Sequence, residues 1–307
     1  MTCPIRLLFP AHPFERGAIE PDYAAEVGAA DGLGLARSLV QVEPLLERAD
    51  GAAAVRRVAE GAGEPALYRG WMLSPDQYAA LHAALTERGL APVTSPAAYR
   101  HTHWLPESYA AIERWTAPSA WLPVTELTVD RAVALARTFG PRPLVVKDYV
   151  KSRKHEWAEA CFIPDATDGA GVARVVTRFL ELTGPELQGG LVLRVFLELE
   201  LVGAHARSAM PLAREWRVFW CDGAPALTAP YWPEVAGAPP PVAEFAEAAA
   251  RVASRFFTMD LARRRDGGWV IVELGDGQVA GLPEGAAPAA FLSAVVARLA
   301  RPGIALV

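Results

Sequence analysis

Lysine is almost absent from this sequence of 307 residues: of its 30 basic residues, only Lys147, Lys151 and Lys154 are not arginine. All three lie in the segment Pro143–Trp157, PLVVKDYVKSRKHEW. A position that keeps lysine against such a bias needs the compact ammonium charge, which suits contact with phosphate oxygens, and not the broad guanidinium fork. The apolar run Leu144–Lys147 predicts a short buried strand, so we expect Lys147 and Lys151 to bind an anionic ligand. The alternative is a solvated basic loop.

Cysteine is also scarce. Cys3, Cys161 and Cys221 are widely spaced and form no CxxC motif, which argues against a disulfide framework or a zinc site. No run approaches the ~20 apolar residues of a membrane span, and the first residues lack the pattern of a secretory signal. We therefore expect a cytoplasmic protein that binds no membrane. The net charge of −5 and the short extent of the basic cluster argue against nucleic acid binding.

Glycine-rich phosphate motifs are missing as well, because the first predicted strand, Ile5–Phe9, runs into PAHPF and no GxxxxGK[ST] motif occurs. The first ~115 residues instead alternate short apolar strands with helices, the pattern of an α/β layer. The other strands predicted here are Ser38–Val42, Ala66–Tyr68 and Ala91–Val93. The clearest helix has Ser74 as its N-cap and Gln77 completing a capping box.

Several polar residues of this layer are candidates for binding. Arg69, within YRGWM, and Arg100 can line a pocket for an anionic acceptor substrate. The alternative for Arg69 is an edge arginine stacked beside Trp71. His101 and His103 form an HxH motif, but no acidic or cysteine ligand lies nearby in the sequence, so we interpret it as a solvent-facing loop.

Residues 116–200 predict a compact β-α-β-loop-β-α-β lobe. Its predicted elements are strand Ala120–Val124, helix Val129–Phe139, strand Leu144–Lys147, strand Glu159–Ile163, helix Gly169–Thr183 and strand Leu191–Leu201. Alternation in the last strand puts Glu198 and Glu200 on one face with Arg194. These carboxylates either accept hydrogen bonds from a ligand amine or form the solvent face of an edge strand.

The strand Glu215–Cys221 ends in Asp222-Gly223, a signal for a two-residue hairpin turn. Its alternation separates Glu215 and Arg217 from a face of tryptophan and valine. Because the face of tryptophan and valine belongs to the core, Glu215 and Arg217 lie on the opposite face, where a binding site can form.

A second hairpin is predicted from Phe256–Ala262 and Trp269–Leu274. A two-residue turn at Asp266-Gly267 brings Asp260 directly opposite Glu273. Facing carboxylates have Cβ atoms roughly 4.5–5.5 Å apart and repel each other.

A divalent cation held by oxygen ligands would neutralise this carboxylate pair, with Asp276 as a third oxygen donor. The alternatives are a shifted register, or neutralisation by Arg263 or Arg264. We favour the metal, because Glu273 otherwise has no reason to interrupt an apolar run.

The ordered series LVVKD, VFLELE, EWRVFW and MDLARRRDGGWVIVELGDGQVAGL resembles the ATP-grasp family over about residues 100–300. Within that family it looks like the divergent branch named for its two arginines and one lysine. The resemblance implies an α+β ATP-grasp fold, in which two lobes hold ATP, preceded by an α/β layer. The implied domains are 1–115 for the layer, 116–200 for the small lobe and 201–307 for the C-terminal lobe with the metal site.

By position, the resemblance implies that Lys147 contacts ATP phosphates and that Glu198 contacts the ribose or adenine. Arg217 would contact the γ-phosphate or the reaction intermediate, and Glu215 is a further candidate for the nucleotide site. The implied magnesium ligands are Asp260, Glu273 and Asp276. Three departures from the family pattern are visible. The usual glycine-rich loop is replaced by Asp148–Trp157, where Lys151 would cover the phosphates instead, and no lysine upstream in the lobe can act as the family's other nucleotide lysine. Gly275 stands before Asp276 where the family often has asparagine.

The function that this resemblance implies is that of an ATP- and Mg²⁺-dependent ligase. It would activate a small-molecule or peptide carboxylate as an acyl phosphate and join it to an amine, releasing ADP and phosphate. The protein would act by positioning and charge neutralisation, as a monomer or homodimer. The alternatives are a nucleotide-binding module without turnover and a small-molecule kinase.

Overall fold

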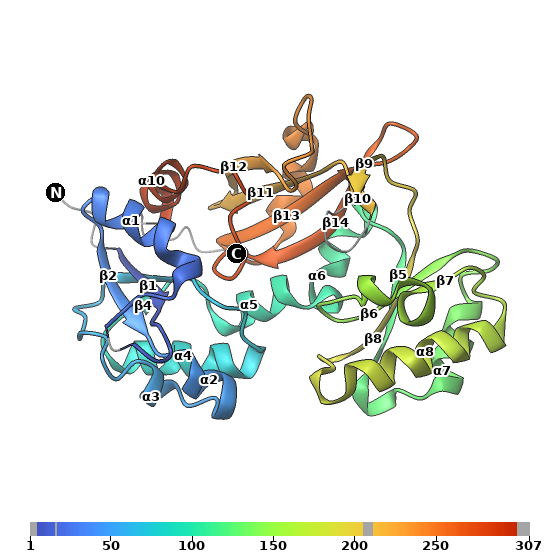
Figure 1. Ribbon diagram of the computed structural model, residues 1–307, viewed down its shortest axis with the longest axis horizontal. Helices are drawn as coiled ribbons and strands as arrows, with labels where there is room; N and C mark the ends of the chain where they lie inside the picture. Colours follow the sequence, from blue (N-terminus) through green and yellow to red (C-terminus); the bar gives the residue numbers. More distant parts are fainter. Residues whose placement is uncertain (1–4, 16, 205–210, 300–307) are drawn as a thin grey trace.

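The computed structural model describes residues 5–15, 17–204 and 211–299 of the chain. In these ranges it forms three four-stranded sheets and one two-stranded ribbon. Figure 1 shows the N-terminal layer in blue, a small lobe in green and yellow and a large lobe in orange and red. Within the same ranges, no helix has the length and apolar character needed to cross a bilayer.

The N-terminal layer is built on a parallel sheet with strand order β2-β1-β3-β4. Its strands are β1 (Arg6–Pro10), β2 (Ala36–Val40), β3 (Pro65–Tyr68) and β4 (Ala91–Pro92). The four predicted strands are therefore confirmed to within two residues at each end. The predicted capping box is also confirmed, since Ser74 and Gln77 each accept the other's backbone N–H at the start of α4.

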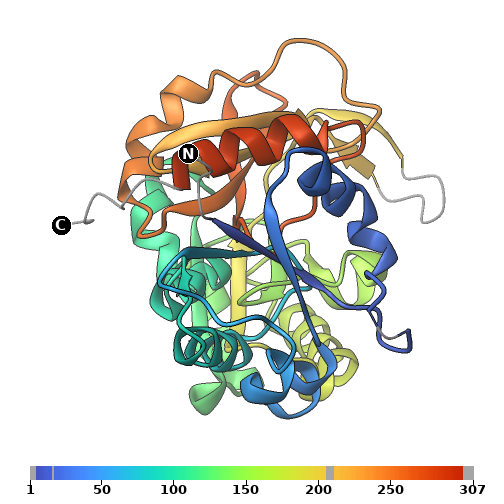
Figure 2. The same ribbon diagram turned by 90° about the vertical axis from the view of Figure 1, so that its left-hand side faces the viewer.

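Helices cover both faces of this sheet. One face packs on α2 (Glu43–Arg48), α3 (Gly51–Ala54), α4 (Pro75–Glu87) and α5 (Pro96–His103). The other face packs on α1 (Ala24–Gly32) and α10 (Pro288–Leu299). Figure 2 shows α10, in red, beside α1, in blue, although they come from opposite ends of the sequence. The chain after the large lobe therefore returns to the N-terminal layer.

The small lobe is an antiparallel sheet with order β5-β8-β6-β7, covered on one face by two helices. Its elements are β5 (Ser119–Pro123), α7 (Val129–Arg137), β6 (Leu144–Asp148), β7 (Phe162–Ile163), α8 (Gly169–Thr183) and β8 (Gly190–Val195). The helix Gly169–Thr183 and its Asp168 cap are confirmed. The returning strand is shorter than predicted, because Trp157–Cys161 forms a π-helical turn.

The prediction of one long strand Leu191–Leu201 is wrong. The strand ends at Val195, which pairs with Leu144, the first residue of β6. After one further hydrogen bond, from Phe196 N–H to Pro143 O, the chain leaves the small-lobe sheet, and Leu199 pairs instead with Arg264 of the large lobe. A regular ribbon forms again only with β9 (Leu201–Ala204) and β10 (Pro211–Ala213). Consequently Glu198 does not lie on a small-lobe strand.

The large lobe is an antiparallel sheet with order β12-β11-β13-β14. Its strands are β11 (Glu215–Cys221), β12 (Ala224–Pro230), β13 (Phe256–Arg263) and β14 (Trp269–Asp276). Helices α6 (Leu105–Ile112) and α9 (Ala246–Arg251) cover one face. The predicted turn between β11 and β12 is confirmed, with positive φ at Asp222 (46°) and Gly223 (74°).

The pairing of Asp260 with Glu273 is confirmed, although the predicted turn that led to it is wrong. The backbone N–H of Arg264 donates to Gly268 O, which closes a three-residue turn and not a two-residue one. That turn alone would shift the register by one residue. A bulge between Asp260 and Leu261 shifts it back, so the two carboxylates still face each other.

Candidate functional site

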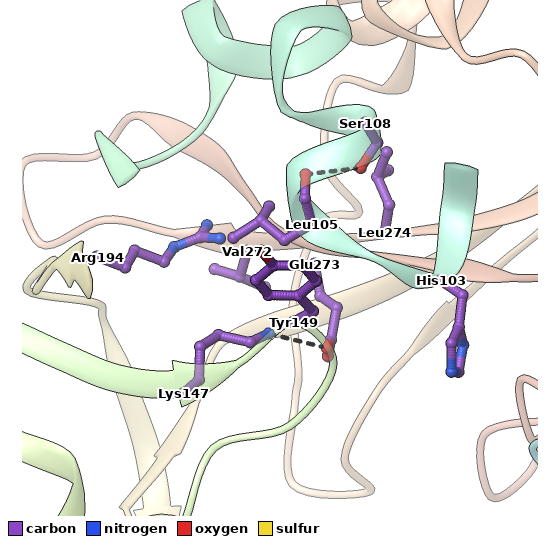
Figure 3. Close-up of a pocket in the computed structure, with 9 residues that line it drawn as sticks. All are labelled: His103, Leu105, Ser108, Lys147, Tyr149, Arg194, Val272, Glu273 and Leu274. Atoms are coloured by element: carbon purple, nitrogen blue, oxygen red, sulfur yellow. Dashed lines mark hydrogen bonds and ion pairs between the residues drawn. The ribbon is translucent and has the colours of Figure 1, made fainter. Parts of the chain in front are cut away.

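Lys147, Arg194 and Glu273 line a cavity where the small lobe meets the large lobe and helices α5 and α6 (Figure 3). Its volume is about 10 Å³, room for about one water molecule. Lys147 on β6 and Arg194 on β8 share the sheet face that turns away from the apolar core of the small lobe. Glu273 comes from β14. Three strands distant in sequence thus bring these side chains together.

An ion pair joins the two lobes: the Nζ of Lys147 lies 3.6 Å from the Oε1 of Glu273 (Figure 3). Burial lowers the pKa of Lys147, and the negative charge of Glu273 opposes this shift without cancelling it. Burial also raises the pKa of Glu273, but the charges of Lys147, Lys154 and Arg217 outweigh it and hold that pKa below its usual value. Glu273 is therefore an ionised carboxylate at neutral pH.

Asp260 is 1% exposed and is held by Arg217, its neighbour across β11 and β13. The Nε of Arg217 donates to Oδ1 at 2.9 Å and the Nη2 to Oδ2 at 2.7 Å. Burial opposes the charge on Arg217, but the carboxylate of Asp260 outweighs it and raises the pKa of Arg217. The guanidinium also lies 4.6 Å from the centre of the Tyr231 ring. These contacts fix the position of the Arg217 guanidinium with its charge intact.

The two facing carboxylates are thus each neutralised within the protein, Asp260 by Arg217 and Glu273 by Lys147. The two arginines that the sequence offered as alternatives, Arg263 and Arg264, do not neutralise either carboxylate. Arg263 pairs with Glu200 and Arg264 with Asp266. The repulsion between Asp260 and Glu273, from which the sequence analysis inferred a metal site, is therefore already relieved without a metal. In the described part of the chain, no group of three or more histidine, cysteine or acidic side chains is arranged to hold a metal.

Asp276 lies apart from this pair. It is three residues beyond Glu273 on β14, hence on the opposite face, and is fully buried. Its Oδ1 accepts from the backbone N–H of Gln278 at 3.0 Å and from its side chain at 3.1 Å. Burial raises the pKa of Asp276 to about 7. The structure does not bring Asp276 to the other two predicted magnesium ligands.

Glu215 lies two residues before Arg217 on β11, near Asp260. Burial, and after it the charge of Asp260, raises the pKa of Glu215 to about 8. The charges of Lys154 and Arg217 oppose this shift. Lys154 therefore lies within electrostatic range of the acidic side chains of the large lobe, which makes it a candidate that the sequence analysis did not select.

Two other predicted nucleotide residues, Lys151 and Glu198, lie outside the cavity. Lys151 is exposed, and its backbone N–H donates to the side chain of Asp148 at the end of β6. Glu198 is 66% exposed and pairs with Arg265 at 3.1 Å. Neither side chain lines the cavity shared by Lys147 and Glu273.

The two predicted substrate arginines have different surroundings. Arg69 is 1% exposed and pairs with Glu26, so its guanidinium is bound within the protein. Arg100 is 51% exposed, pairs with Glu107 at 2.5 Å and lies over the Trp104 ring at 4.8 Å. Of the two, only Arg100 is accessible to a ligand.

Arg194 and His103 are cavity residues that the sequence analysis did not assign. The Nη2 of Arg194 donates to Thr116 Oγ1 at 2.7 Å and to Ile271 O at 3.2 Å, and burial lowers the pKa of Arg194 to about 10. An arginine inside the apolar strand LVLRV was the available signal. The interpretation of the HxH motif as a solvent-facing loop is wrong: His103 ends α5, is 5% exposed, and burial lowers its pKa to about 4.

Comparison with known proteins gives a family for this arrangement. Residues 138–298 match the model of an ATP-grasp domain family, the third family of the clade named for two arginines and one lysine. No curated protein matches the sequence.

Solved structures share the fold at low identity. A RimK domain protein ATP-grasp from Sphaerobacter thermophilus is 15% identical, with a TM-score of 0.57 over 95% of this chain and 99% of that one. The D-cycloserine synthetase DcsG is 18% identical, with a TM-score of 0.56 over 96% and 99%. The ATP-grasp ligase PsnB, solved with minimal precursor, Mg and ADP, is 14% identical, with a TM-score of 0.55 over 98% and 100%. At these identities the likeness shows the fold alone.

Asp276 should make stability fall as the pH rises. Its carboxyl keeps a proton up to about pH 7 in the native protein, whereas the unfolded chain releases it near 3.8. The native state binds more protons in this window, so we expect the free energy of unfolding to decrease there by on the order of 2–4 kcal/mol. Asp276→Asn should flatten this slope in urea unfolding measured from pH 4.5 to 8. Equal slopes in both proteins would mean that native Asp276 is ionised throughout.

Asp260→Asn should destabilise the metal-free protein by roughly 2–4 kcal/mol, because it leaves the mostly buried Arg217 without its partner. Glu273→Gln is the matched comparison and should cost less than about 1 kcal/mol, since Glu273 is 46% exposed and its ion pair is long. Urea unfolding in the presence of a chelator measures both. Stabilisation by Asp260→Asn would show that repulsion from Glu273 outweighs the Arg217 contact.

Proposed function

We propose that this chain, which belongs to the third ATP-grasp family of the clade named for two arginines and one lysine, is an ATP- and Mg²⁺-dependent carboxylate–amine ligase. It would activate a carboxylate as an acyl phosphate and join it to an amine or similar nucleophile, with release of ADP and phosphate. The observation that carries the proposal is the pair of cation–carboxylate contacts, Lys147 with Glu273 and Arg217 with Asp260, at the junction of the lobes. In this proposal residues 116–200 and 201–307 are the lobes that hold ATP, after the layer 1–115.

Nucleotide binding would exchange the partners of these four side chains. The phosphates of ATP are anions that compete with Glu273 for Lys147 and with Asp260 for Arg217. The carboxylates released in this way are two facing oxygen donors, and Mg²⁺ binds through one or two carboxylates together with phosphate oxygens. Asp260 and Glu273 therefore fit a magnesium site without a third protein carboxylate. When bound, the metal would neutralise negative charge on the phosphates.

Lys147 and Arg217 would act by electrostatic stabilisation of the transferring phosphoryl group, without a covalent protein nucleophile. Lys151 and Lys154, on the exposed loop after β6, would cover the phosphates. Arg194 adds a second buried cation beside Lys147, so the cavity carries two positive charges against the single carboxylate of Glu273. That excess favours an anionic ligand. Glu215 and Glu198 stay candidates for the nucleotide, and Arg100 for the carboxylate substrate.

The cavity of about 10 Å³ is too small for a nucleotide, so in this proposal the lobes separate around the Lys147–Glu273 contact when ATP binds. Arg194 provides a fixed point for that movement. It ties β8 to Thr116 and to the backbone of β14, and Thr116 itself donates to Ile271 O at 2.7 Å. The lobes can then rotate about this point while their strands stay intact.

Lys147→Ala should weaken binding of a non-hydrolysable ATP analogue with Mg²⁺ by at least about tenfold, and Lys147→Arg should restore little of it. The reason is that the planar guanidinium of arginine does not fit the place that the compact ammonium of Lys147 would occupy between Glu273 and the phosphates. Isothermal calorimetry measures both affinities. Arg131→Lys, on the outer helix α7 and 54% exposed, is the control and should keep full affinity. Full affinity in Lys147→Arg would refute the requirement for lysine.

The nucleotide product should be ADP, because the proposed cations and metal act on the β- and γ-phosphates. Turnover in the presence of hydroxylamine and a library of carboxylates should give a hydroxamate, which identifies the carboxylate before the natural amine is known. Arg217→Lys should lower kcat at least about tenfold while changing analogue affinity less, since its charge is needed most in the transition state. Chromatography of the products measures this.

The same experiment separates the alternatives. AMP and pyrophosphate would indicate adenylate chemistry and exclude the acyl phosphate. A stable phosphorylated product would indicate a kinase. Analogue binding without carboxylate-dependent turnover would indicate a nucleotide-binding module.

A further inference from the structure

Arg69 ties the N-terminal layer to the segment that follows β14. Its Nε and Nη2 each donate to a carboxylate oxygen of Glu26 at 2.8 Å. Its Nη1 donates to the backbone oxygens of Gly277, Gln278 and Ala280. The side chain is 1% exposed, so water does not compete for these contacts. One guanidinium therefore fixes a carboxylate and three carbonyls at once.

Arg217 contacts the last residue of the same segment. Its Nη1 donates to Gly281 O at 3.1 Å, one residue after Ala280, whose carbonyl accepts from Arg69 at 2.9 Å. The start of the segment is close-packed, because a Cβ at Gly277 would lie 2.7 Å from the Phe256 ring. Two arginines thus hold neighbouring carbonyls of one confined stretch of backbone.

We propose that Arg69 is a positioning residue for Arg217 and acts through the backbone of residues 277–281. This inference rests on the proposed function, in which Arg217 leaves Asp260 for the phosphates. Gly281 O then becomes the hydrogen-bond acceptor that, together with the Tyr231 ring, keeps Arg217 oriented. Its place is set by Arg69, so Arg69 determines where the charge of Arg217 lies when phosphoryl transfer begins.

The contacts of Arg69 need arginine. A lysine ammonium is a single point charge on a flexible stem and cannot hold Glu26 and the three carbonyls together. Arg69→Lys keeps the positive charge beside Glu26, which avoids leaving a buried carboxylate unpaired. It therefore releases the segment 277–281 with the least disturbance to the fold.

The first test observes Arg217 directly in the nucleotide-free protein. Its Nε–H signal in a ¹H–¹⁵N spectrum is assigned by its loss in Arg217→Lys. In Arg69→Lys this signal should shift or broaden. The Nε–H signal of Arg255, which makes the equivalent bidentate contact with Asp222 at 2.7 and 2.8 Å, is the internal control and should stay in place. An unchanged Arg217 signal would overturn the proposal, whether or not the protein proves to be a ligase.

The second test is a double-mutant cycle on kcat. Arg69→Lys should lower kcat at least about tenfold with a smaller change in KM for ATP, because misplacement of a charge affects the transition state most. Combined with Arg217→Lys it should cost no more than Arg217→Lys alone, since both changes remove one function. Arg255→Lys should leave kcat unchanged.

Additive losses would show that Arg69 acts independently of Arg217 and would overturn the proposal. Absence of turnover in the wild-type protein would refute the ligase function and leave the spectroscopic test standing.

Discussion

The site depends on two facing carboxylates, Asp260 and Glu273, that repel each other unless cations hold them. Arg217 reaches Asp260 from the adjacent strand β11, and Lys147 reaches Glu273 from the other lobe. Neutralising the hairpin therefore requires both the large-lobe sheet and the contact between lobes. In the proposed function the two cations would bind phosphates and the two carboxylates would bind a divalent metal. In the free protein these four groups bind each other instead.

This arrangement gives a reason for lysine at position 147 in a chain that otherwise uses arginine. In the proposed function Lys147 would exchange the carboxylate of Glu273 for a phosphate without moving far, which a compact ammonium does with little geometric demand. Arg217 has the opposite task, because its fork holds Asp260 bidentately and leaves one nitrogen for the backbone. Several other arginines, among them Arg131 and Arg264, pair with exposed carboxylates, where either cation would serve.

The N-terminal layer reaches the site through buried polar contacts at the end of β14. Arg69 and the side chain of Tyr78 hold the segment that begins at Asp276, and α10 packs beside α1 on the same layer. Buried polar networks of this kind are costly when incomplete, which favours one arrangement of layer and lobe. The layer thus fixes the segment that follows β14.

Local patterns in the sequence determined most strands, the capped helices and the ordered series of family motifs, because periodicity and caps act within a few residues. The pairing of Asp260 with Glu273 was predicted from a turn that does not form, and a bulge compensated for the difference. The sequence could not show that Arg217 and Lys147 neutralise these carboxylates, that Arg69 lies buried beside Glu26, or that Asp276 faces the N-terminal layer. Those facts depend on contacts between segments 43 to 174 residues apart, within the lobes and between them, which only the tertiary structure decides.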